Sequence, residues 1–255
     1  MTTRIRLITR ADDAGSNSSA NRGIKECIEA GFLKNVSLMA VGSAIEEAGE
    51  LFASHKEICF GLHTCLNAEW DNVRWGSLLP DHEVSSLLDS TGNFFATTRA
   101  LHNNQPNVGE IFRELNAQLE RLWALGFSIR YADMHMGWGW VVPNMSSLFA
   151  DWCAEQGILD YTPLHRDLPG FRLAEDPIPP LLQALESAEA GQYAIVAHPA
   201  YDNEEMRGLG HTGYEGKQVA WERERERMIY TDPRIREHCL KSGVVSIRYD
   251  EAERL

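Results

Sequence analysis

The sequence predicts an α/β protein of one domain, residues 1–255, folded as a distorted or incomplete TIM-like (β/α) barrel. Three observations favour this fold. Hydrophobic runs of strand length alternate with helical segments at short spacing, which is typical of a parallel sheet built from βαβ units. Acidic or histidine residues follow four of these runs, as they would if parallel strands delivered their ends to one rim. No GxGxxG follows the first run, which disfavours an open dinucleotide-binding sheet.

The first half of the chain alternates predicted strands and helices. Strands are predicted at residues 5–13, 36–41 and 58–63, and helices at 24–32, 44–55 and 108–126. The helices carry apolar residues three or four positions apart, which gives each one a buried face. Residues 67–107 contain turn formers and scattered aromatics without a steady period. We therefore expect a long excursion at the active rim there.

The second half continues the alternation with less regular connections. Strands are predicted at residues 127–135, 193–201 and 244–251, and helices at 145–157, 181–190, 220–229 and 233–243. The stretch 167–180 is rich in proline and reads as irregular. The run WERERERM within the helix at 220–229 has alternating charges, which is typical of a solvated helix face.

Composition limits the compartment and the partners. The 255 residues are 44% hydrophobic, which is enough for one sizeable core. The net charge of −13 disfavours non-specific attraction to nucleic acid or to anionic membranes. Five cysteines without a CxxC pair favour a reduced protein, and we find no signal peptide or run of 18 apolar residues. We expect a cytoplasmic protein with no membrane partner.

The residues at the strand ends suit a catalytic metal site. Asp13, His63 and His135 offer one hard oxygen and two imidazole nitrogens, a set that binds Zn²⁺ and neighbouring divalent ions. Water at such an ion is a usable nucleophile near neutral pH. Asp12 and His198 are then available as general base and general acid.

Each of these residues also has a structural explanation. Asp12 and Asp13, which precede Ala14, are also compatible with a turn or a helix N-cap. A single histidine at a strand end is often a hydrogen-bonding residue and not a metal ligand. If the backbone stays extended, Asp12 and Asp13 point in different directions, so they cannot bind a metal in the same way. Recurrence at several strand ends is what favours a metal site.

Neighbouring residues suggest supporting roles. Trp138 and Trp140 are candidates for stacking on a sugar ring, although packing at the barrel rim explains them equally well. Asp133 is expected to orient His135 or another imidazole. Cys65 is better explained as a buried structural cysteine than as a thiolate ligand.

Successive motifs of the chain resemble those of a known family, the YdjC-like (ChbG/HpnK) carbohydrate deacetylases. They are RADDAGSN, NRGIKECIEAGFLKNVSLMA, GLHTCLN, EIFRELNAQLERLWALGFSIRYADMH, AHPAYD and ERERERMIYTDPRIREHCLKSGVVSIRYDE. Together they cover nearly the whole chain. As an ordered set they are specific, whereas ADD or HP alone would be a weak signal.

The resemblance implies a distorted barrel that uses one divalent ion, Mg²⁺ or Zn²⁺, to remove acetyl groups from N-acetylated sugars, often as a homodimer. The family's metal positions fall on Asp13, His63 and His135. Asp12 would be the general base and His198 the acid or a charge stabiliser. The arginine of the closing strand motif, Arg248, would bind substrate.

Two departures from the family pattern concern the surroundings of the site. The chain has RADDAG where the family usually has NADDFG, and DMHMGW where the family has a histidine run such as DSHHH. His135 matches the first histidine of that run, while Met136 and Gly137 occupy the next two positions. These changes put a chitobiose-type substrate in doubt.

Two other functional classes compete with this prediction. A barrel amidohydrolase or phosphoesterase acting on another small molecule would normally carry an HxH pair after the first strand, where this chain has ADD. A non-catalytic sugar-binding relative would be suggested by loss of Asp12 or His198, and both residues are present.

Overall fold

The computed structural model describes residues 4–255, so the first three residues of the predicted domain lie outside it. Its sheet is built from β1 (Ile5–Ala14), β2 (Asn35–Leu38), β3 (Cys59–Thr64), β4 (Ile129–Met134), β5 (Leu159–Asp160), β6 (Arg166–Asp167), β7 (Gly191–Ala197) and β8 (Val244–Ile247). The order is β5-β4-β3-β2-β1-β7-β6, with β8 paired to β1, and every pairing is parallel. The predicted incomplete barrel is confirmed: within residues 4–255, no pairing of β5 with β6 closes the sheet.

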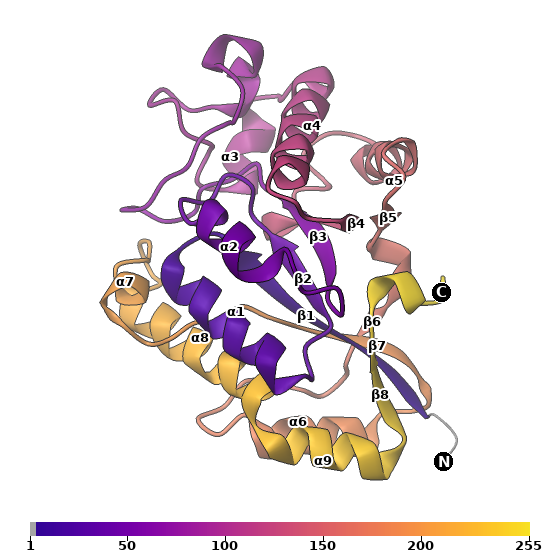
Figure 1. Ribbon diagram of the computed structural model, residues 1–255. Coiled ribbons are helices and arrows are strands. Elements are labelled where there is room, and N and C mark those ends of the chain that lie inside the picture. Colours follow the sequence, from indigo (N-terminus) through magenta and orange to yellow (C-terminus); the bar gives the residue numbers. More distant parts are fainter. Residues whose placement is uncertain (1–3) are drawn as a thin grey trace.

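Helices cover the outside of this sheet (Figure 1). They are α1 (Ser18–Ala30), α2 (Ile45–Phe52), α3 (Thr98–Asn103), α4 (Val108–Ala124), α5 (Met145–Glu155), α6 (Ile178–Ser187), α7 (Glu204–Arg207), α8 (Gly216–Thr231) and α9 (Pro233–Ser242). In Figure 1, α1 lies beside α8, and α6 lies beside α9. None of the helices between residues 4 and 255 combines the length and apolar character needed to cross a bilayer.

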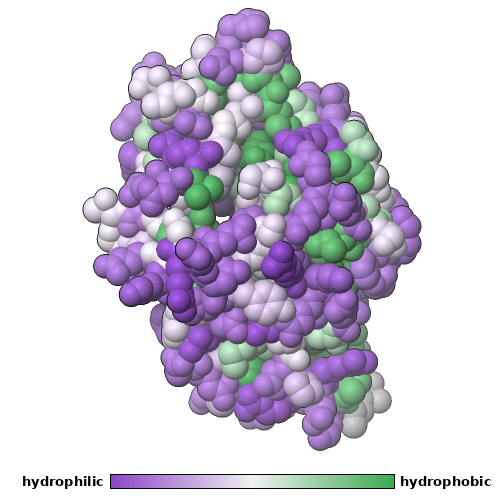
Figure 2. Space-filling view, turned by 60° about the vertical axis from the view of Figure 1, so that its left-hand side comes forward, coloured by the Kyte–Doolittle hydropathy of each residue, from purple (hydrophilic) through white to green (hydrophobic). Residues whose placement is uncertain are grey.

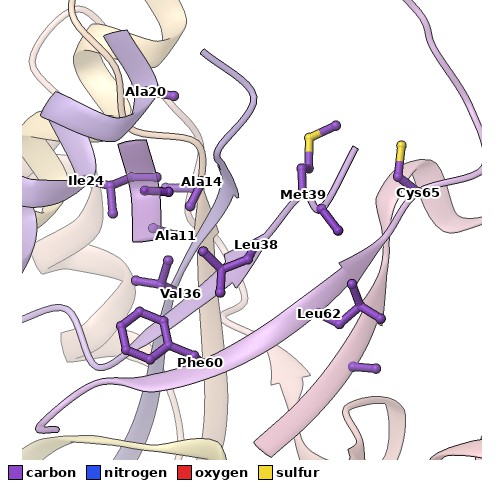
Figure 3. Close-up of a cluster of buried hydrophobic side chains, with 14 of the residues drawn as sticks. Ala11, Ala14, Ala20, Ile24, Val36, Leu38, Met39, Phe60, Leu62 and Cys65 are labelled. Carbon is purple, nitrogen blue, oxygen red and sulfur yellow. The ribbon is translucent and has the colours of Figure 1, made fainter. Parts of the chain in front are cut away.

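Alternation along the strands divides the buried side chains into two cores. Residues such as Leu7 and Ala11 of β1 belong to a large outer core between sheet and helices, part of which is drawn on α1, β1, β2 and β3 in Figure 3. Ile8 belongs instead to a small inner core with Tyr131 and Tyr249. Successive strand residues face opposite sides of a sheet, so Arg10 and Asp12 continue the inward row of Ile8.

A glycine makes room for the largest ring of the inner core. Gly61 and Tyr131 are register partners on β3 and β4. A Cβ on Gly61 would lie 2.3 Å from the Tyr131 ring, which is far inside van der Waals contact. The inner core therefore depends on the absence of a side chain at this position.

The structure differs from the sequence prediction mainly where elements are short. The two-residue strands β5 and β6 were not predicted, because such short strands carry no readable alternation. The excursion at residues 67–107 contains α3 and two 3-10 helices, Asp81–Glu83 and Ser85–Leu87. Hydrophilic residues cover most of the face shown in Figure 2.

Candidate metal centre and active site

A backbone irregularity at the end of β1 brings two adjacent aspartates to one site. The register between β1 and β2 shifts between Ala11 and Ala14, and Asp13 has a left-handed φ of 63°. Such a bulge changes the direction of the following side chain. The prediction that Asp12 and Asp13 diverge assumed an extended backbone, and the backbone is not extended at Asp13. Both carboxylates consequently lie near His63.

Asp13, His63 and His135 direct three donor atoms at one point. Asp13 Oδ1 lies 3.5 Å from His63 Nε2 and 3.5 Å from His135 Nδ1, and the two ring nitrogens are 3.1 Å apart. Asp13 Oδ1 is buried and lacks a hydrogen bond within the described chain. This orphaned oxygen and the two converging nitrogens fit a divalent cation, which would bind all three atoms.

The pKa values of these groups are shifted by the charges around them. Burial would raise the pKa of Asp13, but its contacts with His135 and His63 hold that pKa well below its ordinary value. Burial would lower the pKa of His63 and that of His135. Asp133 nevertheless holds the pKa of His63 well above its ordinary value, and Glu69 does the same for the pKa of His135.

Each imidazole is held by a carboxylate through its other ring nitrogen. His63 Nδ1 lies 2.7 Å from Asp133 Oδ1, and His135 Nε2 lies 2.9 Å from Glu69 Oε2. Partners of this kind set the tautomer and orientation of metal-binding histidines. Of the two imidazoles considered for Asp133, the structure therefore selects His63. The sequence analysis did not find Glu69, which lies in a loop without a periodic signal.

Arg10 connects the two buried aspartates of the site. Its Nε and Nη2 atoms lie 2.7 and 2.9 Å from the two oxygens of Asp12, and its Nη1 lies 2.9 Å from Asp133 Oδ2. Ser37 donates a hydrogen bond of 2.6 Å to the same Asp133 oxygen. The sequence analysis also missed Arg10, although its position two residues before Asp12 on a strand places both on one face.

His198 faces the same pocket as Asp13. This pocket is lined by Asp13, Ser16, Asn17, Ala20, Met39, Glu69, Trp70, Trp75, His198, Met206, Leu209 and Arg223. The His198 side chain is 30% exposed, whereas Asp12 is 3% exposed and lies beside His63. The predicted metal and proton-transfer residues are thus brought together at one end of the sheet.

The charged helix α8 contributes to this pocket, so the prediction of a purely solvated face was wrong. Arg223 and Glu226 are only 14% and 16% exposed, and they form an ion pair of 3.1 Å. They lie three positions apart and therefore share the inward face of the helix. Alternating charge alone could not reveal which of these residues are covered by the strand ends.

Trp138 does not have the surface that sugar stacking requires. It is fully buried, its Nε1 donates a hydrogen bond of 3.1 Å to the Thr64 carbonyl, and its ring packs edge-on against Phe149. The alternative explanation, packing at the barrel rim, fits these contacts. Trp70 and Trp75 line the pocket, although both are themselves largely buried.

The other two proposed substrate residues also lie away from the pocket lining. Trp140 is 44% exposed and packs against Arg99, whose guanidinium carbon is 4.7 Å from the ring centroid. Arg248 lies near the starts of β3 and β4, in a cavity lined also by Ile58 and Ser128. The opposite ends of these strands carry the metal site, so Arg248 does not line the pocket beside Asp13.

Cys65 has a structural environment, as expected. Its Sγ lies 3.0 Å from the Nε1 donor of Trp75 and 3.1 Å from the Asn67 carbonyl. Burial raises the pKa of the thiol to about 12. Within the described residues, Cys65 is also not part of the groups of side chains whose ligand atoms converge.

Comparisons with known proteins agree with this architecture. A family model described as YdjC-like protein matches residues 6–241. The chain is 28% identical to a carbohydrate deacetylase of Geobacillus stearothermophilus, with 97% of this chain and 98% of the relative covered. It is 27% identical to a carbohydrate deacetylase of Mus musculus, over 98% and 96% of the two chains.

A solved structure shares the fold. It is a candidate cellobiose-phosphate cleavage protein from Enterococcus faecalis, which superposes with a TM-score of 0.73 at 20% identity. The match covers 98% of this chain and 99% of the other. At this identity the likeness concerns the fold alone.

Proposed function

This chain belongs to the YdjC-like family, and on that premise we propose that it is a metal-dependent hydrolase that removes acetyl groups from an N-acetylated carbohydrate. Relatives that match over almost their whole length are named carbohydrate deacetylases. The observation that carries the proposal is the convergence of Asp13, His63 and His135 on one point beside a pocket.

The donor set supports a single divalent ion at this point. Asp13 Oδ1, His63 Nε2 and His135 Nδ1 would hold it, while Asp133 and Glu69 keep the two imidazoles oriented. When bound, Zn²⁺ or Mg²⁺ supplies a Lewis acid that polarises the acetyl carbonyl and makes water more acidic.

We assign the proton transfers to two residues near this point. Asp12 accepts the proton of the attacking water, with Arg10 holding its carboxylate in place. His198 donates a proton to the sugar nitrogen as the amide C–N bond breaks, because an amine anion is too poor a leaving group to depart unprotonated. Acetate and the free amino sugar are then the products.

The pocket lining supports a carbohydrate substrate. This lining combines the edges of two tryptophans, Trp70 and Trp75, with the polar residues Ser16 and Asn17, a mixture of apolar and polar groups that suits a sugar ring and its hydroxyls. A homodimer and a cytoplasmic location stay predictions.

The proposal is tested by metal analysis and acetate release on protein purified without chelator. We expect about one equivalent of divalent metal and acetate release from at least one member of a panel of N-acetylated mono- and oligosaccharides. His63→Ala should lower metal affinity and activity by at least about tenfold. The matched control is His82→Ala, since His82 is exposed and away from the pocket lining.

Three outcomes would contradict the proposal. Fully metal-loaded protein that releases no acetate but cleaves phosphate esters would be a phosphoesterase. Protein that binds sugars without turnover would be a non-catalytic relative. Unchanged metal affinity in His63→Ala would mean that the ligand set is wrong.

A further inference from the structure

One carboxylate oxygen of α8 accepts a hydrogen bond from the His198 backbone and lies near the His198 ring. Glu226 Oε2 accepts a hydrogen bond of 2.9 Å from the His198 backbone N–H and lies 3.3 Å from His198 Nδ1. Arg223 Nη1 donates to the same oxygen at 3.1 Å. Three positively polarised groups thus converge on one atom.

Glu226 is charged and has little solvent around it. Burial would raise the pKa of Glu226, but Arg223 and His198 lower that pKa to about 2. The Nδ1 atom of His198 is itself buried and makes no hydrogen bond within the described chain, and Glu226 Oε2 lies at ion-pair distance, 3.3 Å away. Because His198 lines the pocket, Nε2 is the nitrogen left for a substrate.

The segment that carries His198 is held tightly between two helices. Ala200 N donates to the Arg223 carbonyl of α8 at 3.3 Å. On the other side, a Cβ on Gly23 of α1 would lie 2.8 Å from Ala200 Cα, so the chains are in close contact. With the backbone set in this way, rotation of the imidazole is the remaining freedom, and the Glu226 carboxylate is positioned to limit it.

We propose that Glu226 is a positioning residue for His198, which keeps a proton on Nδ1 and presents Nε2 to the pocket. This rests on the proposed function only for the part that His198 plays in turnover. In the proton transfer, the Nε2–H bond of the imidazolium breaks and an N–H bond to the departing nitrogen forms. The neutral ring that remains keeps its Nδ1 proton toward Glu226, as in other carboxylate–histidine pairs.

The charged groups around His198 are few and define the test. Glu226 and Arg223 face it from α8, Asp13 lies across the pocket on β1, and Glu69 lines the same pocket. Glu226 is the one with direct contacts to His198. A neighbouring acid, Glu224, pairs with Arg227 and provides a matched control on the same helix.

The first experiment reads the tautomer of His198 by ¹⁵N NMR of histidine-labelled protein, with His198→Ala identifying the signal. In the wild type we expect the neutral ring to carry its proton mainly on Nδ1. In Glu226→Gln the Nε2–H form should become the major one, and Glu224→Gln should leave the wild-type pattern. An unchanged tautomer in Glu226→Gln would overturn the proposal.

The second experiment measures kinetics in a double-mutant cycle. Glu226→Gln should lower kcat by about 10- to 100-fold with KM changed less than about twofold, as expected when an outer partner of a functional imidazole is lost. In a His198→Ala background the same change should cost less than about twofold, since Glu226 acts through His198. Equal losses in both backgrounds would mean a structural role and would overturn the proposal.

Two provisions keep the tests decisive. If Glu226→Gln does not fold, Glu226→Asp replaces it. Aspartate keeps the charge, but its side chain is one methylene shorter, so its carboxylate lies farther from His198. A smaller change of the same sign is then expected, and none would overturn the proposal. If the wild type deacetylates no sugar, the proposed function fails, while the NMR experiment still decides the role of Glu226.

Discussion

Two adjacent aspartates at the end of β1 have different partners, and this difference supports the different roles proposed for them. Asp13 faces two imidazole nitrogens, whereas both oxygens of Asp12 lie against the Arg10 guanidinium. The left-handed backbone at Asp13 takes the second carboxylate out of the alternation of the strand and brings it to the same site as Asp12, where it meets different partners. Strained backbone of this kind is often found at functional sites.

We predict that the Asp12→Asn variant keeps the fold and the metal but lowers turnover by about 10²–10⁴-fold. The amide preserves the shape and cannot accept the proton of water. Steady-state kinetics and metal analysis on the same preparation check both parts. Wild-type turnover would remove Asp12 as the base, and Glu69, the other acid that lines the pocket with Asp13, would be tested next.

Side chains on the two faces of the strands pack into an inner and an outer core. The inner core lies beneath the polar site, and the Tyr131 ring fills it over Gly61. His63 follows Gly61 by two positions on β3, and Asp133 follows Tyr131 by two positions on β4. The packing of Tyr131 against Gly61 therefore helps to set the position of His63 and Asp133 at the site.

We predict that Gly61→Ala destabilises the protein by about 1–3 kcal/mol, because the added methyl overpacks a closed core. Gly49→Ala in the middle of α2 is the matched control. Its Cβ would meet Leu125 at an ordinary 3.5 Å, and alanine favours a helix over glycine by about 1 kcal/mol. Urea unfolding of both variants checks the prediction, which would fail if the two had the same free energy of unfolding.

The stability of the folded protein depends on pH through its buried charges. Glu226 has a pKa of about 2 in the folded protein against an ordinary value of 4.5. A group with a lowered folded pKa stabilises the fold above its unfolded pKa and loses that contribution as the pH falls through the folded value.

We therefore predict that the free energy of unfolding falls as the pH drops from about 4.5 toward 2, with a loss on the order of a few kcal/mol attributable to Glu226. Glu226→Gln should be less stable than the wild type at pH 7, and the difference should shrink by pH 3. Urea unfolding at these pH values gives the comparison. A difference that stays constant with pH would contradict this assignment.

The barrel class, the long strands and helices, and the aspartates and histidines at the strand ends could all be predicted from the amino-acid sequence. These features are local. The alternation of apolar and polar residues, the helical periodicity and the residue that follows a strand can each be recognised within a few positions of the sequence. The family motifs extend the same information along the chain.

Which of these residues contact one another became visible only in the folded structure. Asp133 is paired with His63 across 70 positions, Glu69 with His135 across 66, and Glu226 with His198 across 28. The folded structure also shows that Trp138 is buried and that α8 turns two charges inward. No local pattern encodes these outcomes, because each depends on which distant side chains occupy the space around a strand end once the sheet has curved.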